Sequence, residues 1–294
     1  MLCGILLLDK PLGVSSNAAL QRVRRLLRAD KAGHVGSLDP LATGMLPICL
    51  GEATKIAGDI LSGRKRYRFA IALGSRTATG DVEGAVVETL PVPDFDAAAL
   101  QAVLQRFHGR TTQIPPMYSA IKRDGQPLYK LARAGVEVER KARDIEIAEL
   151  TVVQRDGARL ELEALCSKGT YIRVLAEDIA RALGTCGHVA ELRRLSVEPF
   201  DSAAMQTMDE VTARAERGEP PMLFEADLAI PHLPAVHLSA DGTRRVLHGQ
   251  AVTVPAEVAP GRVRLYDAQG HFFGVGEADG FGLVQPRRLF VAAD

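Results

Sequence analysis

One glycine-rich segment holds the side chains best suited to chemistry. Residues 33–44 read G-H-V-G-S-L-D-P-L-A-T-G and contain one imidazole, His34, and one carboxylate, Asp39. The glycines allow another part of the chain to approach this backbone closely. The segment matches neither G-x-x-x-x-G-K-[ST] nor G-x-G-x-x-G, so it indicates no nucleotide-binding loop. Spacing alone leaves two interpretations of Asp39 open: a catalytic carboxylate, or a turn residue that bonds its own backbone.

A second segment could supply a partner for that carboxylate. Residues 166–178 read C-S-K-G-T-Y-I-R-V-L-A-E-D, with Tyr171 and Arg173 two positions apart. In an extended segment this spacing points both side chains to the same side. Two partners for Arg173 stay open: the loop carboxylate, which it would keep ionised, or Glu177 on its own helix.

Strands and helices must hold these two segments in place. Residues 5–8 are an apolar run typical of a buried strand, and residues 15–17 can cap a helix whose apolar side chains recur at helical spacing. The patterns further on predict strands at 67–73 and 189–200, and two or three strands within 136–166. They predict helices at 96–107, at 127–134, from 170 or 171 to about 183, and at 209–217, with a connector at 109–119.

The last sixty or so residues change character. From Pro234 onward, short apolar runs at 252–254, 263–266, 272–275 and 283–285 are separated by glycines. This spacing predicts a small β-barrel or β-sandwich.

The charge of the chain is balanced overall and uneven locally. The 294 residues include 36 Lys and Arg against 36 Asp and Glu, a formal net charge of zero. Residues 1–200 carry a net charge of +5, whereas residues 201–230 carry −5. Basic residues gather at 22–31, 64–68 and 122–143. Each cluster alone fits a solvated face, but the three together make RNA or DNA a candidate partner.

Composition also excludes several classes of protein. No stretch of 18 apolar residues occurs, so no transmembrane helix is predicted, and the first ten residues do not fit a signal peptide. We therefore expect a cytoplasmic protein with reduced cysteines. Cys186 and His188 are too close in sequence to form a tetrahedral zinc site, so we expect no metal.

Three segments together resemble the bacterial TruB-type tRNA pseudouridine synthases, which isomerise uridine 55 of the tRNA T-loop. They are residues 9–16 (D-K-P-L-G-V-S-S) and the two segments described above. The resemblance runs from Gly4 to about Phe200. It implies an α+β fold: a mixed, mainly antiparallel sheet with flanking helices, and a small C-terminal β-barrel of PUA type. The implied domains are 1–230, with an RNA-gripping insertion at about 113–143, and 234–294.

The resemblance also implies roles for particular residues. Asp39 corresponds to the catalytic aspartate and Arg173 to the arginine that ion-pairs with it. Tyr67 is similar to the tyrosine that stacks on the target uracil, and Tyr171 to a second active-site aromatic residue. Among the implied substrate-binding residues, Lys10 would support the active-site loops, His34 would help hold the rearranged T-loop, and Leu192 would line the uracil pocket. The remaining implied substrate-binding residues are the basic residues Arg22, Lys122, Arg123, Lys130, Arg133, Arg140 and Lys141.

The reaction explains why such residues are needed. Pseudouridine forms when the uracil N1–C1′ bond breaks, the base turns, and C5 joins C1′. An anionic oxygen must act at C1′ or at C2′, and both routes stay open. No water attacks, so one carboxylate suffices. Tyr67 could hold the detached base by stacking, while Tyr171 could pack the pocket or relay the C5 proton. We expect base flipping, no cofactor, and a monomer with tRNA as partner and no obligatory protein partner.

Two other functions remain open. A non-catalytic RNA-binding or tRNA-folding protein could keep the same scaffold, although it would not need Asp39, Tyr67, Tyr171 and Arg173 together. A related synthase could act on ribosomal or guide-directed RNA, although guide-dependent relatives are generally longer and carry basic tails.

Overall fold

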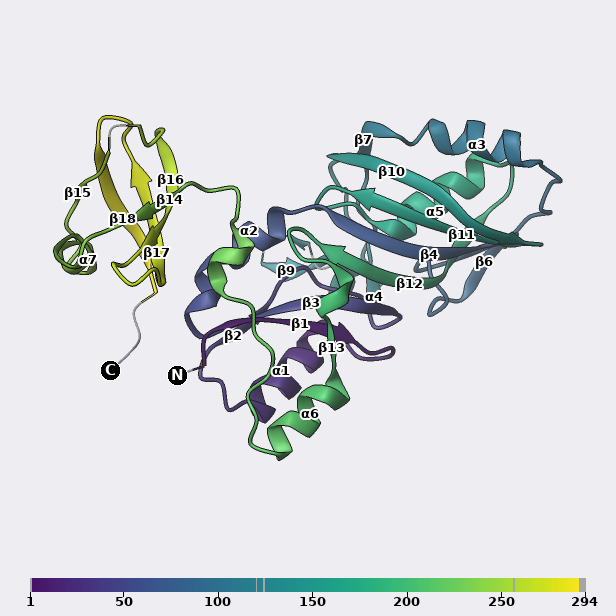
Figure 1. Ribbon diagram of the computed structural model, residues 1–294. Helices are drawn as coiled ribbons and strands as arrows, with labels where there is room; N and C mark the ends of the chain where they lie inside the picture. The colour runs from purple at the N-terminus through teal and green to yellow at the C-terminus, as the bar shows by residue number, and fades with distance from the viewer. Residues whose placement is uncertain (1, 120, 124, 256, 291–294) are drawn as a thin grey trace.

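A nine-stranded sheet runs through the larger part of the molecule, and a separate five-stranded sheet forms its C-terminal part (Figure 1). The computed structural model describes residues 2–119, 121–123, 125–255 and 257–290. Within these residues, helices flank the large sheet and the fold is α+β, as predicted. No described helix combines the length and the apolar character needed to cross a membrane.

The large sheet is mixed and mainly antiparallel, with the order β13-β1-β3-β12-β4-β11-β10-β7 and with β2 paired beside β3. The pairs β1–β13 and β3–β12 are parallel. Its strands are β1 (Gly4–Lys10), β2 (Ala32–His34), β3 (Ala42–Leu50), β4 (Lys65–Leu73), β7 (Gly109–Gln113), β10 (Arg143–Asp156), β11 (Arg159–Cys166), β12 (Gly187–Val197) and β13 (Gln206–Thr207).

Helices with apolar faces cover this sheet at two places. Near β4, β11 and β12, α3 (Ala97–Gln105) and α5 (Ile172–Ala182) contribute to one buried cluster. Near β1 and β3, α1 (Ser16–Leu26) and α6 (Met208–Glu216) contribute to another. The predicted cap at the start of α1 is present, since the Ser15 hydroxyl accepts a hydrogen bond from the amide of Ala18. Capping of this kind satisfies amide groups that the first turn leaves without partners.

Shorter elements complete the body. They are the 3-10 turns η1 (Gly51–Ile56), η2 (Ser202–Ala204) and η3 (Ala226–Ala229), the helix α2 (Ala57–Ser62), and the hairpin strands β5 (Ser75–Thr77) and β6 (Val86–Thr89).

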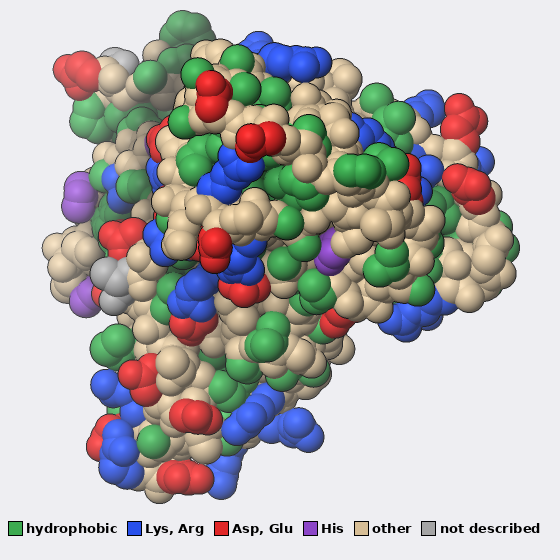
Figure 2. All heavy atoms as spheres, turned by 90° about the vertical axis from the view of Figure 1, so that its right-hand side faces the viewer, with side chains coloured by type: hydrophobic (Ala, Val, Ile, Leu, Met, Phe, Trp, Pro, Cys, Tyr) green, Lys and Arg blue, Asp and Glu red, His purple; other side chains and the backbone are tan. Residues whose placement is uncertain are grey.

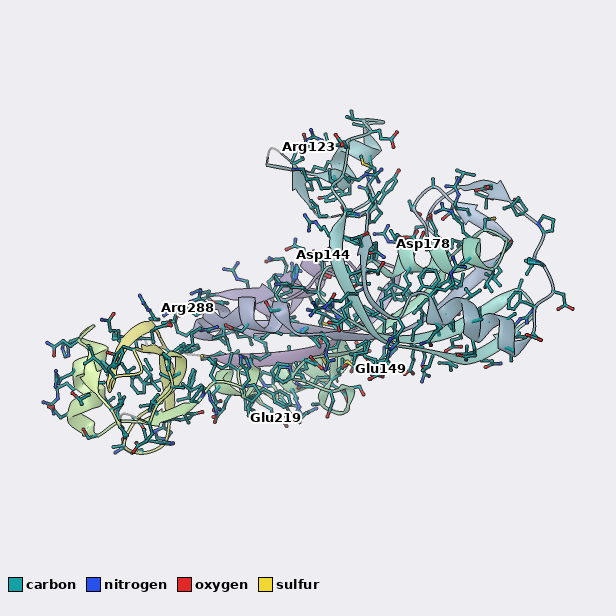
Figure 3. All side chains as sticks on the ribbon, turned by 90° about the horizontal axis from the view of Figure 1, so that it is seen from above. Arg123, Asp144, Glu149, Asp178, Glu219 and Arg288 are labelled. Carbon is teal, nitrogen blue, oxygen red and sulfur yellow. The ribbon has the colours of Figure 1, made fainter. Side chains whose placement is uncertain are left out.

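An insertion between β7 and β10 stands out from the sheet. It contains β8 (Lys122–Arg123), β9 (Gln126–Pro127) and α4 (Leu128–Arg133). Figure 3 shows Arg123 at its far end, on the same side of the sheet as Asp178 of α5, whereas Glu219 lies on the opposite side. The insertion therefore overhangs the face that α5 covers.

The C-terminal sheet has the order β14-β16-β17-β18-β15. Its elements are β14 (Ala235–His237), α7 (Ala240–Leu247), β15 (Val252–Thr253), β16 (Gly261–Tyr266), β17 (Phe272–Ala278) and β18 (Leu283–Leu289). The four predicted strands are present, whereas β14 and α7 were not predicted. β14 has only three residues, and α7 has only eight residues and buries only Val246.

Several elements of the body were not predicted, among them the central strand β3, and one predicted connector is partly a strand. Residues 109–119 were expected to form a connector, but Gly109–Gln113 pairs with β10 as the edge strand β7. Its middle residues, Arg110 to Thr112, are exposed, so the strand has no apolar alternation by which sequence could reveal it.

Two arginines of β4 form ion pairs within the sheet. Half-buried Arg66 pairs with Glu149 of β10, two strands away, at 2.6 Å, and exposed Arg68 pairs with Glu163 of the adjacent strand β11 at 2.6 Å. Within the basic cluster at 64–68, Arg66 and Arg68 therefore have local partners on the sheet face, whereas Lys65 is buried. Figure 2 shows the same mixing of sign on the end of the molecule away from the C-terminal sheet, where acidic and basic side chains lie beside one another.

Candidate active site

A cavity of about 440 Å³ opens where the glycine-rich loop, the starts of β4 and α5, and the insertion meet. Five predicted residues line it, and they come from four distant parts of the chain: Asp39, Tyr67, Tyr171, Arg173 and Leu192. The sheet register brings them together, because Leu192 of β12 lies between Ala42 of β3 and Phe69 of β4.

Hydrogen bonds to Gly13 and Ser16, which follow β1 in the chain, hold the loop that carries Asp39. The Ser16 hydroxyl accepts a hydrogen bond from the Leu38 amide at 2.7 Å and donates one to the Leu38 carbonyl at 2.9 Å. The Gly13 amide donates to the carbonyl of Pro40 at 2.8 Å. These bonds hold the backbone on both sides of Asp39, which leaves little freedom for the position of the carboxylate.

Arg173 pairs with the carboxylate of Asp39 at 3.0 Å and with that of Asp81 at 3.6 Å. It also donates to the carbonyls of Thr79 at 3.0 Å and Tyr118 at 2.7 Å. The Arg173 side chain is 6% exposed, whereas that of Asp39 is 42% exposed. The guanidinium is therefore held by the protein, and the carboxylate faces the cavity.

The structure selects between the alternatives left open by the sequence. Arg173 lies in the first turn of α5, so the assumption of an extended segment shared with Tyr171 was wrong. Its partner is the loop carboxylate, and Glu177 pairs with Arg181 instead. Asp39 does take part in a turn, but through its carbonyl, which accepts from the amide of Ala42 at 3.0 Å, so the carboxylate is left to Arg173.

The ionisation of Asp39 reflects opposing effects. Burial raises its pKa above the ordinary value and the nearby Asp81 carboxylate raises it further, while Arg173 and Lys10 lower it. The net direction is upward. Arg173 thus favours the charged form but does not outweigh the loss of solvent around the carboxylate.

Tyr67 is positioned by a buried arginine that the sequence analysis did not single out. Arg194 is 1% exposed and donates to the carbonyls of Met45 at 2.7 Å and Gly36 at 2.8 Å. It lies opposite Tyr67 in the β4–β12 pair and hydrogen-bonds with its side chain. Burial raises the pKa of Tyr67, so its hydroxyl is protonated and the ring presents a neutral aromatic face.

Tyr171 is held in position by hydrogen bonds between its backbone and the side chain of Gln113. The Gln113 side chain accepts a hydrogen bond from the Tyr171 amide at 2.7 Å and donates to the Tyr171 carbonyl at 3.2 Å. Gln113 ends the edge strand β7 and is 6% exposed. Burial raises the pKa of Tyr171.

Lys10 and His34 lie beside the cavity rather than on its lining. Lys10 is fully buried, and its ammonium donates to the carbonyls of Pro11 at 2.9 Å, Val14 at 2.7 Å and Pro40 at 3.4 Å. Burial lowers the pKa of Lys10 to about 8. His34 is in β2, its buried Nδ1 has no hydrogen-bond partner among the described residues, and burial lowers its pKa.

The predicted RNA-binding cations occupy two surfaces. Arg22 is exposed on α1, and the exposed side chains of the insertion are Arg123, Lys130, Arg133 and Lys141. Arg140 is half-buried and donates to the carbonyl of Pro115 at 3.4 Å, so it helps to hold the insertion together. The side chain of Lys122 lies outside the described part of the structure.

Three site residues escaped sequence reasoning: Asp81, Gln113 and Arg194. Each acts on a segment far away in the chain, so no local pattern reveals it. The sequence of β12 did not single out Arg194 either, because the strand also contains His188, Glu191 and Arg193. The described residues contain no group of three or more His, Cys, Asp or Glu side chains that could hold a metal ion.

The arrangement suits chemistry at a sugar carbon next to a planar base. A carboxylate with a fixed cationic partner faces a cavity, and aromatic and apolar side chains of Tyr67, Tyr171 and Leu192 line the same space. A carboxylate of this kind can act as nucleophile or base, and an aromatic face can stack on a base.

Family models match most of the chain. The TruB family pseudouridylate synthase N-terminal domain matches residues 24–172, the tRNA pseudouridylate synthase B C-terminal domain matches 173–223, and the pseudouridine synthase II TruB C-terminal model matches 234–290. The chain is 51% identical over 290 residues to "tRNA pseudouridine synthase B" of Pseudomonas putida, covering 97% of this chain and 95% of the relative. It is 49% identical over 289 residues to the protein of the same name from Nitrosococcus oceani, covering 97% and 94%.

Solved structures share the fold at lower identity. A chain in the crystal structure of a Cbf5-Nop10-Gar1 complex has a TM-score of 0.75 and 24% identity, with 98% of this chain and 85% of that chain covered. A chain in an H/ACA RNP bound to a substrate RNA containing 2′-deoxyuridine has a TM-score of 0.75 and 22% identity, covering 99% and 86%. At this identity the likeness concerns the fold alone.

Proposed function

The chain belongs to the TruB family of pseudouridylate synthases, and from this premise we propose that it isomerises uridine 55 in the T-loop of tRNA to pseudouridine. The observation that carries the proposal is the Asp39–Arg173 pair, at 3.0 Å, on the wall of a cavity that Tyr67 also lines. A binder of tRNA would have no need for a carboxylate held in this way.

In the proposed reaction the target uridine is flipped out of the T-loop into the cavity. Asp39, ionised and aimed by Arg173, acts on the sugar at C1′ or C2′ while the N1–C1′ bond breaks. The uracil stays in the cavity against Tyr67, turns, and joins C1′ through C5. C5 then loses its proton, and N1, released from C1′, carries a proton in the product, so substrate and product have the same atoms.

The cavity supports this sequence because it can exclude water during the turn. Leu192, Ile121 and Leu61 provide apolar lining, and Ile121 belongs to the insertion that stands out from the sheet (Figure 3). A water molecule at C1′ would release the base and leave an abasic site, so a dry cavity favours rejoining. The exposed cations of the insertion would contact phosphates of the T-arm.

We also propose that the enzyme works as a monomer in the cytoplasm. In support, one copy of the chain supplies a carboxylate, its arginine partner and the aromatic side chains that the proposed reaction uses. Light scattering of the purified protein, with and without tRNA, tests the oligomeric state, and a stable dimer would contradict this part.

The experiment for the function is direct. The purified protein is incubated with an unmodified tRNA transcript without added metal, and pseudouridine is mapped by carbodiimide modification and primer extension. We expect one new stop, at position 55, and none in a transcript with cytidine at that position. Absence of product, or product only at other positions, would contradict the proposal.

A further inference from the structure

The C-terminal domain is attached to the body at the segment η1–α2. Arg262 of β16 donates to both carboxylate oxygens of Asp59 in α2, at 2.5 and 3.2 Å. The Asp59 side chain is only 12% exposed. Lys55 of η1 donates to the carbonyl of Leu289 at 2.5 Å, and Arg288 donates to the carbonyl of Lys55. Forked arginine–carboxylate pairs are strong and orient both partners.

Apolar packing reinforces the same attachment. Ile56 and Ile60 are fully buried in one cluster with Val275 of the C-terminal sheet, and Phe272 and Phe290 pack against that cluster. The helix α2 has six residues, too few to be stable through its own hydrogen bonds. Its position is therefore set by what it packs against, and the C-terminal domain is one of its neighbours.

The far end of α2 forms part of the active-site wall. Leu61 lines the cavity and lies against Gly36, three residues before Asp39. The carbonyls of Leu61 and Gly63 each accept a hydrogen bond of 2.6 Å from the ammonium of Lys65. Lys65 begins β4, two residues before Tyr67. A shift of α2 would thus reach the Asp39 loop and the Tyr67 strand together.

We propose that the Asp59–Arg262 pair is a positioning contact, through which the C-terminal domain fixes α2 and with it the wall of the active-site cavity. The inference rests on the proposed function and adds that this domain contributes to the rate of isomerisation apart from holding RNA. Active-site geometry tolerates little displacement, since shifts near 1 Å can cost a large factor in rate.

The competing explanation is that Arg262 contacts an RNA phosphate. It lines a cleft of about 460 Å³ together with Arg287 and Arg288, and such a cleft could attract a polyanion. Both Asp59 oxygens already accept from Arg262, however, so a phosphate would have to break a forked pair. The two explanations predict losses in different quantities: rate for a positioning contact, affinity for a phosphate contact.

Single-turnover rates at saturating tRNA, and tRNA affinity by filter binding, separate them. We expect Arg262→Gln to lower the rate about tenfold while the dissociation constant changes less than about twofold. The matched control is Arg287→Gln, which removes a cation from the same cleft but whose ion pair, with Glu277 at 3.9 Å, lies within the C-terminal domain. Its rate should equal that of wild type.

A double variant in which Asp59 and Arg262 exchange their charges tests the positioning role even if Arg262→Gln folds poorly. The double variant Asp59→Arg with Arg262→Asp restores an ion pair and should recover most of the lost rate, with thermal unfolding measured in parallel. A loss confined to affinity, or a folded exchange variant without recovery, would overturn the positioning role. An inactive wild type would instead contradict the proposed function, so the two failures are distinguishable.

Discussion

At the scale of single residues, one guanidinium organises the site. Arg173 holds the cavity-facing carboxylate of Asp39 and the buried carboxylate of Asp81 at the same time. Asp81 is 3% exposed and accepts further hydrogen bonds from the Thr79 hydroxyl and the Glu83 amide. A carboxylate so enclosed has no access to substrate, so we assign it the task of orienting Arg173.

The Asp81→Asn variant should reveal that task in its pH dependence. Asp81 raises the pKa of Asp39, so neutralising it should lower that pKa. Because Asp39 must be ionised, the acid limb of the single-turnover rate should move to lower pH, while the maximal rate falls about tenfold as Arg173 loses a partner. An acid limb that stays in place or moves upward would contradict this assignment.

Lys10 should leave a signature in stability against pH. Burial lowers its folded-state pKa to about 8, below the ordinary value of 10.5. Between these values the unfolded chain binds more protons, so the contribution of Lys10 to stability grows as pH rises from 8 to about 10. We measure the free energy of unfolding in urea for wild type and Lys10→Met at pH 8 and at pH 10. Over this range the stability of wild type relative to the variant should increase by about 1–3 kcal/mol. A difference independent of pH would count against a buried, charged Lys10.

The candidate residues that lie in sequence motifs could be predicted, whereas the residues that hold them in position could not. Asp39 and Arg173 lie in two recognisable segments, and the resemblance paired them. Asp81 and Gln113 lie in segments without any motif, and their contacts with Arg173 and Tyr171 depend on the folded loops. The position of Arg173 in a helix was also misjudged, because spacing alone does not fix backbone conformation.

At the scale of elements, the site depends on one parallel strand pair. The β3–β12 pair sets Gly44 beside Arg194, and the β4–β12 pair sets Arg194 beside Tyr67. A Cβ atom at Gly44 would lie 2.1 Å from the carbonyl oxygen of Arg194, and Gly44 has a φ of +97°. Only glycine allows the two strands to approach in this way.

Gly44→Ala should therefore be severely destabilising. We expect a loss above about 3 kcal/mol in the free energy of unfolding, because backbone atoms of a paired strand cannot move aside. Gly13→Ala is the matched control: its φ is +76°, but nothing lies within 4 Å of the added methyl group, so about 1 kcal/mol of backbone strain is expected. Equal losses in the two variants would contradict the packing argument.

Several elements with a clear apolar pattern were predicted well, whereas the central strand β3 and most short or edge elements were not. The strands near 67–73 and the helix ending near 183 follow their apolar patterns. By contrast, β7 pairs through its backbone while exposing its side chains, and α7 buries a single residue. These elements are determined by their neighbours, so tertiary pairing rather than local sequence decides them.

At the scale of the whole molecule, the neutral total charge conceals surfaces with different uses. The arginines of β4 are paired with glutamates on the sheet face, whereas the insertion presents Lys130, Arg133 and Lys141 as exposed side chains. The RNA-binding charge should therefore lie on the insertion, and the sheet face should contribute little.

Salt dependence separates these surfaces. We expect tRNA affinity to fall with salt concentration, and Lys130→Gln or Lys141→Gln to reduce the slope by about one each. Arg66→Gln is the matched control, since Arg66 is paired with Glu149 at 2.6 Å and should leave the slope unchanged. A flat salt response, or an equal effect of all three variants, would contradict this distribution of charge.

We propose that Asp39 performs the chemistry within this scaffold. The most direct measurement is the single-turnover conversion of uridine 55 by Asp39→Asn, with tRNA affinity determined on the same preparation. Asparagine keeps the size of the side chain but removes the anionic oxygen that the sugar requires. We predict affinity within about threefold of wild type and a rate reduced by at least about a thousandfold. Pseudouridine formation at a rate near that of wild type would contradict the account.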